Sequence, residues 1–353
     1  MSQFCSRPLR QFILLMAIVV ISAGVLLSTS KKVEINSDAL AMFAPLPPAM
    51  TSPDNPETEA KVKLGRMLYY EPRLSADQKI SCNTCHALDS YGAEPMPVSV
   101  GFKNQHGTRN APTVYNAAGH FVQFWDGRAS TVEEQAKGPI TNPIEMGLPS
   151  SSVAVQVLKS IPEYQDLFHL AFPNDKDPVT YDNMALAIGA FERGLVTPAR
   201  WDAFLKGDQS AITDAEKAGF NTFASVGCQW CHNGAYVGGG QYQKLGVMVP
   251  WPNQKDRGRY QVTKDEVDVM VFKVPSLRNV EMTAPYFHDG SVATLSQAIR
   301  QMGAHQRGAQ LSDAQVKSIA TWMKCLTGPI PTSYIAPPAL PKSTPQTPPA
   351  AGK

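Results

Sequence analysis

Two short runs of the chain share one pattern, in which two cysteines three positions apart are followed directly by a histidine. The runs are Cys82, Cys85 and His86, and Cys228, Cys231 and His232. Two thiols at this spacing can add to the two vinyl groups of one haem, and the adjacent imidazole can reach its iron from the same turn of chain. The sequence therefore predicts two covalently bound haem c groups, with His86 and His232 as the proximal iron ligands.

Two other uses of these cysteines fit the sequence less well. A four-thiolate zinc site usually has its cysteine pairs about 15–20 residues apart, whereas these pairs begin at Cys82 and Cys228 and would leave both histidines without a role. A thioredoxin-like redox pair needs a βαβ context, which the sequence lacks. Of the remaining cysteines, we assign no role to Cys5 and expect Cys325 to be a buried thiol.

The sixth ligand of each iron decides what such a protein does. A thioether ligand raises the reduction potential and favours electron transfer, whereas an open position favours reaction with peroxide. The available side chains are 13 methionines and five further histidines, namely His106, His120, His169, His288 and His305. A lone histidine is more often a surface or core residue than a ligand, so position alone does not choose among them.

The N-terminus has the composition of an export signal. Arg7 and Arg10 precede a largely apolar run at 12–27, which is short for a bilayer span and typical of a signal-peptide core. Small residues at 28–30 suit cleavage, but an A-x-A pattern is missing and Lys31 follows directly. An uncleaved membrane anchor therefore stays an alternative to a cleaved signal peptide. In either case we expect the body of the chain in the periplasm.

Length and composition favour two domains of ordinary size. The chain has 353 residues, of which 43% are hydrophobic, and its net charge is +2. No basic stripe interleaved with aromatic residues is present, so nucleic acid is not an expected partner. Many prolines cluster at 44–56 and beyond 329, in segments expected to be extended and to lie outside the folded unit. The expected boundaries are a signal peptide or anchor at 1–30, a Pro-rich linker at 31–56, an N-terminal haem domain at 57–195, a C-terminal haem domain at 196–328 and a Pro-rich tail at 329–353.

Helical patterns surround both cysteine motifs. Met184, Ile188 and Phe191 lie on one face of an expected helix. Residues 213–216 and 312–315 have the form of capping boxes that open helices. A third box at 294–297 opens a short helix that we expect to end near Met302 and Gly303. Alternating strand patterns are scarce, so the expected fold class is mainly α, with long loops such as 233–252.

Four longer segments outside the cysteine motifs carry a family resemblance. They are LGRMLYYEPRLS at 64–75, TRNAPTVYNA at 108–117, QFWDGRASTVEEQAKGPITNPIEMG at 123–147 and KVPSLRNVEMTAPYFHDGSVATL at 273–295. Together they resemble the bacterial dihaem cytochrome c peroxidases, in the order and spacing of that family, over about residues 57–328. The resemblance implies two cytochrome-c-like helical domains, each with one haem c, and a calcium ion near their interface.

The resemblance also implies a division of labour between the two haems. In this family the N-terminal haem reduces hydrogen peroxide to water, and the C-terminal haem accepts electrons from a small soluble cytochrome c or a blue-copper cupredoxin. By position, Met302 is the axial ligand of the C-terminal haem, and Trp125 lies between the haems. Glu145 matches the distal acid of the peroxide site, and Gln135 matches a neighbour in that pocket. Members of the family are often homodimers.

The resemblance also implies a calcium site, and at one position this sequence departs from the family's pattern. Asn110, Thr283 and Pro285 match the family's calcium ligands, largely through carbonyl oxygens, and such a site with few charges suits calcium of moderate affinity. Many members carry a histidine directly after the glycine of the loop that matches 98–101, and this histidine closes the peroxidatic iron in the oxidised enzyme. Phe102 stands there instead and cannot ligate iron. We therefore expect an open resting site, with His106 as the alternative ligand.

The residue types fit this chemistry on their own terms. Peroxide cleavage needs one oxygen deprotonated and the leaving hydroxide protonated, and a carboxyl group such as Glu145 can do both. The indole of Trp125 is a reasonable relay between two buried haems.

Two rival functions stay open. One is oxidation of a protein substrate, as in the maturation enzyme of methylamine dehydrogenase, whose axial tyrosine corresponds to Met302. The other is a non-enzymatic dihaem electron-transfer cytochrome, in which Glu145 would be incidental.

Overall fold

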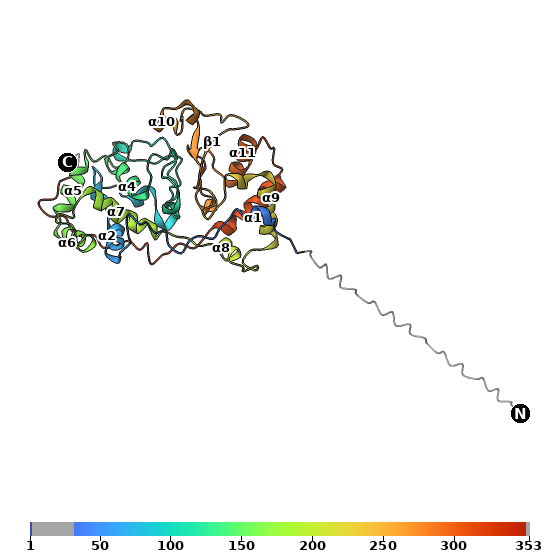
Figure 1. Cartoon of the computed structure of the whole chain (residues 1–353), viewed down its shortest axis with the longest axis horizontal. Helices are drawn as coiled ribbons and strands as arrows, with labels where there is room; N and C mark the ends of the chain where they lie inside the picture. Colours follow the sequence, from blue (N-terminus) through green and yellow to red (C-terminus); the bar gives the residue numbers. More distant parts are fainter. Residues whose placement is uncertain (2–31, 351–353) are drawn as a thin grey trace. The chain divides into compact units, whose positions relative to one another are not determined.

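The computed structural model describes Met1 and residues 32–350 (Figure 1). The signal peptide or anchor expected at 1–30 lies, Met1 apart, outside the described residues. Within the described part of the chain, no helix is both long enough and apolar enough to cross a bilayer.

The structure is mainly helical, as the sequence predicts. The longer helices are α2 (Glu59–Tyr69), α4 (Val132–Thr141), α5 (Ser151–Lys159), α6 (Pro162–Ala171), α7 (Tyr181–Arg193), α8 (Arg200–Leu205), α9 (Asp214–Val226), α11 (Leu295–Arg307) and α12 (Asp313–Met323). Shorter ones are α1 (Ser37–Leu40), α3 (Cys82–Cys85) and α10 (Tyr260–Thr263). Two strands, β1 (Tyr242–Lys244) and β2 (Val271–Lys273), pair antiparallel with Tyr242 opposite Lys273. The capping boxes expected at Thr213 and Ser312 are present, each with its reciprocal side-chain bond.

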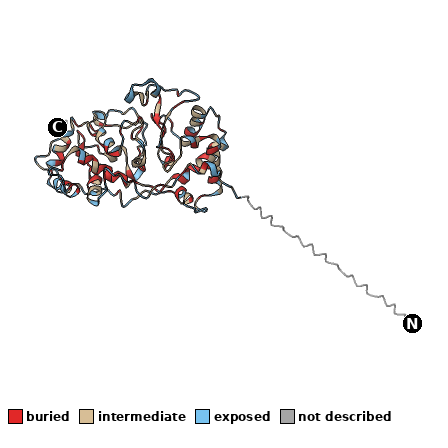
Figure 2. Ribbon diagram, in the orientation of Figure 1, coloured by how far each residue is buried: buried red, intermediate tan, exposed pale blue. Residues whose placement is uncertain are grey.

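Buried apolar side chains form two separate clusters, whose residues Figure 2 shows in red. The first is built mainly on α2 packed against α7, with α4, α5 and α6 around them, and Cys82 lies against it. The second is built mainly on α9 packed against α12, with Trp201 and Trp322 at its centre, and Cys228 lies against it. Each cysteine motif therefore has a hydrophobic core of its own, which is what a haem needs on its faces. The exact domain boundaries stay a prediction.

The expectation that the Pro-rich ends lie outside the folded unit is wrong. In the N-terminal segment Phe43 is buried in the second cluster, whereas Asn55 is buried against α4 and donates to Glu133 Oε1 at 2.9 Å. In the C-terminal segment Ile335 is buried in the first cluster, and Tyr70 Oη donates to its carbonyl oxygen at 2.6 Å. Proline keeps the backbone of these segments extended, but the apolar residues between the prolines still gain free energy from burial.

The expected end of the helix near Met302 and Gly303 is also wrong, because α11 continues to Arg307. Gly303 lies inside the helix, where a β-carbon would come 2.8 Å from the Leu311 side chain, so glycine here allows close packing. The helix ends at Gly308, whose φ of +63° is the left-handed conformation that glycine adopts without strain.

Candidate functional site

The first cysteine motif presents a neutral imidazole. Cys82 and Cys85 form the single turn of α3, and His86 follows at its C-terminal end. Its Nδ1 lies 3.3 Å from the carbonyl oxygen of Gly92, and its own carbonyl oxygen accepts from Tyr69 Oη at 2.9 Å. Burial lowers the pKa of His86. The ring is therefore uncharged and held through Nδ1, which leaves Nε2 for an iron, the arrangement usual for metal-bound histidine.

The second motif also presents a neutral imidazole. Cys228 begins the 3₁₀ helix η5 (Cys228–Trp230), directly after the end of α9. Burial lowers the pKa of His232 to about 4, although the backbone carbonyl groups of Val237 and Pro275 oppose this shift. Its Nδ1 is buried and has no hydrogen-bond partner among the described residues. The neutral ring fits an imidazole that ligates a haem iron.

The thiols do not fit the rival metal or redox sites. Burial raises the pKa of both Cys82 and Cys228 to about 12, so they are neutral thiols, unlike the low-pKa thiolates of redox pairs. The two cysteine pairs lie against different hydrophobic clusters, and no three His, Cys, Asp or Glu side chains of residues 32–350 form a metal-binding group. Cys325 is fully buried, as expected.

Met302 lies inside α11, partly buried against the second cluster, the one that also contacts Cys228. The expected axial ligand and the second cysteine motif therefore share one core.

The candidate peroxide pocket lies around the turn that follows α4. The amide of Glu145 donates to the carbonyl oxygen of Asn142 at 3.0 Å, which fixes its position in this turn. Burial raises the pKa of Glu145, while the positive charge of Arg128 and a hydrogen bond with Asn142 oppose the shift. Burial raises the pKa of Cys85, and the charges of Glu94 and Glu145 add to this shift, so both carboxyls lie near the first haem attachment. Gln135 is partly buried in α4.

The loop that carries Phe102 is anchored on the same turn. The amide of Phe102 donates to the carbonyl oxygen of Glu145 at 2.7 Å, and its ring packs against the first cluster. The side-chain amide of Gln105 donates to the carbonyl oxygen of Pro143 at 2.9 Å. His106 is exposed and pairs with Val100 in an isolated antiparallel bridge. The structure thus puts Phe102 next to Glu145 and keeps His106 on the outside of the loop.

Trp125 joins segments that belong to both halves of the chain. Its Nε1 donates to the carbonyl oxygen of Asn110 at 2.9 Å, and its carbonyl oxygen accepts from the amide of Lys273 at 2.8 Å. Its ring meets His288 edge to face at 6.5 Å. The amide of Asn110 donates to the carbonyl oxygen of His288 at 2.7 Å, which brings Asn110 beside the chain segment that also contains Thr283 and Pro285.

A buried charge network beside Trp125 was missed by sequence reasoning. Arg109 donates to both carboxylate oxygens of Asp256, at 2.6 and 2.8 Å, and to Asp126 at 2.6 Å. Although burial opposes it, Arg109 holds the pKa of Asp256 below its usual value. Arg109 and Asp126 lie in the 108–117 and 123–147 segments, directly next to Asn110 and Trp125, so this adjacency was the available signal.

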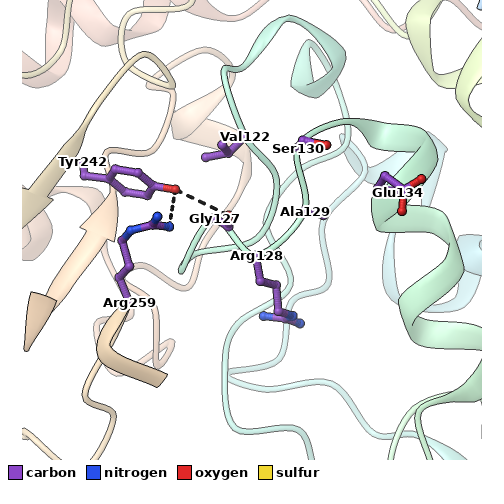
Figure 3. A pocket seen from close by; sticks show the side chains of 8 residues that line it. All are labelled: Val122, Gly127, Arg128, Ala129, Ser130, Glu134, Tyr242 and Arg259. Atoms are coloured by element: carbon purple, nitrogen blue, oxygen red, sulfur yellow. Dashed lines mark hydrogen bonds between the residues drawn. The ribbon is translucent and has the colours of Figure 1, made fainter. Parts of the chain in front are cut away.

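A cavity of about 460 Å³ opens beside the turn at Gly127 (Figure 3). On one side Tyr242 and Arg259 close it, and the Arg259 guanidinium donates to Tyr242 Oη at 2.6 Å. Ser130 and Glu134 lie on the other side, and Arg128 points away from Tyr242 in Figure 3. Arg128 therefore lines this cavity, and its positive charge also acts on Glu145.

Comparisons with known proteins agree on one family. A family model described as di-haem cytochrome c peroxidase matches residues 59–210. The chain is 44% identical over 321 residues to a cytochrome c551 peroxidase of Pseudomonas aeruginosa, covering 89% of this chain and 92% of that protein. It is 45% identical over 295 residues to a cytochrome c551 peroxidase of Nitrosomonas europaea, covering 83% and 87%.

Relatives named for methylamine utilization are less similar. The protein MauG of Methylorubrum extorquens is 36% identical over 243 residues, covering 68% of each chain. Among solved structures, a MauG-like protein associated with microbial copper homeostasis superimposes with a TM-score of 0.73 at 28% identity, covering 83% of this chain and 97% of that one.

Proposed function

Because the chain belongs to the family of di-haem cytochrome c peroxidases, and is thus a peroxidase with two haem c groups, we propose how its residues divide the reaction. The site at His86 reduces hydrogen peroxide to water, and the site at His232 receives the electrons. The observation that carries this assignment is Glu145, a partly buried carboxyl with a raised pKa that lies near Cys85 of the first motif. Among the described residues, no Asp or Glu contributes to the pKa shifts of Cys228 and His232 in the second motif.

The protein's contribution at the first site is proton transfer. When bound, the haem supplies the iron that binds peroxide and, with the second haem, the two electrons of H2O2 + 2e⁻ + 2H⁺ → 2H2O. Glu145 accepts a proton from one oxygen of the peroxide and returns it to the other, which leaves, and its raised pKa favours the return of that proton. Gln135 orients the peroxide by hydrogen bonding, and Arg128 limits how far the pKa of Glu145 rises.

The test of this role is Glu145→Gln in the haem-loaded enzyme. Turnover of hydrogen peroxide with a reduced cytochrome c should fall by about 10²–10⁴-fold, with two haems per chain retained. Glu134→Gln is the matched control, because Glu134 is an exposed carboxylate on the adjoining helix α4. Turnover of Glu145→Gln equal to that of the control would assign the proton transfer to another group.

For the resting first site we propose an open iron, since Phe102 lies where relatives carry a ligating histidine. Anchoring of the loop on the Glu145 turn and the exposed position of His106 support this proposal. Electron paramagnetic resonance of the oxidised protein should give one high-spin and one low-spin signal. Two low-spin signals, one of which becomes high-spin in His106→Ala, would instead make His106 the sixth ligand.

For the second site we propose Met302 as the axial ligand and Trp125 as the link between the haems. The position of Met302 against the cluster that contacts Cys228 supports the first assignment. The hydrogen bonds that Trp125 forms with Asn110 and Lys273 support the second. We also propose a calcium ion held by Asn110, Thr283 and Pro285, on segments joined by the bond between Asn110 and His288.

The electron donor is proposed to dock on an apolar patch beside the second motif. The patch consists of four exposed side chains, Trp230, Val247, Met248 and Val249. The amides of Met248 and Val249 donate to the carbonyl oxygen of His305, and Arg307 of the same helix donates to Val226, two residues before Cys228. Exposed Arg307 lies beside the patch, so a small cytochrome c or cupredoxin with an apolar face and an acidic rim suits it. We propose that the enzyme, like such a donor, lies in the periplasm.

A further inference from the structure

One buried cation lacks the partner that the others have. Among the residues that the structure describes, the buried Arg and Lys side chains are Arg73, Arg193, Lys217, Lys273 and Arg278. Four of them pair with carboxylates, namely with Glu71, Glu133, Asp214 and Asp202. Lys273, only 6% exposed, instead has Nζ 3.1 Å from the carbonyl oxygen of Val122 and 3.4 Å from Nδ1 of His120. A buried ammonium held by two neutral groups is costly unless an anion completes the site.

His120 points to the same missing anion. Its ring is buried, and burial together with the charge of Lys273 lowers its pKa well below the usual value, so it is neutral. If Lys273 donates to Nδ1, the ring proton resides on Nε2. His120 Nε2 is buried and has no hydrogen-bond partner among the described residues. The site therefore presents an N–H donor without an acceptor, at His120 Nε2, beside an ammonium that forms no ion pair.

The position of this pair ties it to the second motif. The His120 ring contacts the edge of Tyr236, at 5.6 Å between centroids, and lies against Gly239, both in the loop that follows His232. Lys273 is in β2, two residues before Pro275, whose carbonyl group acts on His232. The amide of Lys273 donates to Trp125. Lys273 and His120 thus lie between the loop that follows His232 and Trp125, the proposed interhaem residue.

We propose that Lys273 and His120 form the binding site for a propionate carboxylate of the second haem. Each haem carries two such carboxylates, and one of them supplies the acceptor that His120 Nε2 lacks and the negative charge that Lys273 lacks. The site neutralises that carboxylate next to Trp125, where its negative charge would otherwise stabilise the oxidised iron. The proposal rests on haem binding at His232 and not on peroxide turnover, so the two can fail separately.

The test is spectroelectrochemical titration of both haems in Lys273→Met. The reduction equilibrium of the second haem should shift at least tenfold toward the oxidised form, which is 59 mV for a one-electron couple, and the first haem should shift less. Lys244→Met is the matched control, since it removes the same charge from the exposed end of the paired strand β1. Lys273→Arg should restore most of the potential, and His120→Leu, which removes the second donor, should lower it in the same direction.

Three results would overturn the proposal. One is a Lys273→Met potential equal to that of the Lys244→Met control. Another is a larger shift at the first haem than at the second. The third is a wild-type potential that follows the chloride or phosphate concentration, because the site would then take a free anion. If Lys273→Met loses haem or fails to fold, the comparison of Lys273→Arg and His120→Leu with wild type decides.

Discussion

Removal of one partner from the buried ion pair between Glu133 and Arg193 should be among the most destabilising single changes in the first half of the chain. Arg193 Nε and Nη2 each donate to Glu133 at 2.9 Å, and the two side chains are 6% and 8% exposed. Asn55 adds a third donor to Glu133, and Arg193 Nη1 donates to the carbonyl oxygen of Met50 at 2.9 Å. One pair thus joins α4, α7 and the N-terminal segment. Gly189 makes room for it, because a β-carbon there would come 2.5 Å from the Glu133 side chain.

Arg193→Met should lower the free energy of unfolding by about 3–5 kcal/mol, since it leaves a buried carboxylate without its cation. Lys137→Met is the control on α4, because Lys137 pairs with the exposed Glu134 and should cost less than about 1 kcal/mol. Replacing both partners, in Glu133→Leu with Arg193→Met, should recover most of the loss, because no buried charge remains. Denaturant unfolding of the haem-loaded protein measures all three.

The pH dependence of this loss has a definite sign. In the wild type, burial acts to raise the pKa of Glu133. The hydrogen bonds from Arg193 and Asn55 outweigh burial, so this pKa is lowered. Its stabilising contribution is therefore present above the unfolded pKa of about 4.3 and is lost as the pH falls through the lower folded pKa. In Arg193→Met burial is opposed only by the bond from Asn55 and a backbone hydrogen bond, so the pKa of Glu133 should rise and its protonation at low pH should relieve the cost. The difference between wild type and variant should narrow from pH 7 to pH 4. A cost below about 1 kcal/mol at pH 7, or a double variant no better than Arg193→Met, would refute this reasoning.

The proposed roles at the second haem and the calcium site give three further predictions. Met302→His should lower the potential of the second haem and slow electron entry, whereas an unchanged potential in redox titration would place the axial ligand elsewhere. Calcium chelation should slow electron transfer between the haems while two haems per chain remain, and metal analysis that finds no calcium in active enzyme would contradict the site at Asn110. Trp230→Ser should raise KM for the reduced donor with little change in kcat at saturation, and an unchanged KM would move the docking surface away from the apolar patch.

Features encoded within a few residues were predictable from the sequence. The capping boxes at Thr213 and Ser312 depend on a side chain and a backbone amide three residues apart, and both formed as expected. The cysteine motifs are local in the same sense, because five residues supply two thiols and the imidazole. The end of α11 was not predictable in this way. Gly303 continues the helix because Leu311 packs against it, whereas Gly308 ends it.

The Pro-rich ends show a second limit of sequence reasoning. Composition described their backbone correctly as extended, but it did not reveal where they bind. Tyr334 stacks on Phe191 at 5.2 Å and donates to its carbonyl oxygen at 2.8 Å, contacts between residues 143 positions apart. A segment that cannot form a core of its own can still complete one built by other residues.

Buried charges were the part of the site that the sequence concealed most completely. An arginine or lysine is normally solvated, so Arg109 and Lys273 carry no local mark of burial, and their environment depends on residues far away in the chain. Arg109 is satisfied by Asp126, which follows Trp125 directly, and by Asp256, which lies beyond the second motif in the sequence. Lys273 forms no such ion pair, because the nearby Asp126 is already paired with Arg109, and its ammonium donates to the carbonyl oxygen of Val122. The protein therefore balances one cation near Trp125 with its own acids and leaves the other for an acid that the haem brings.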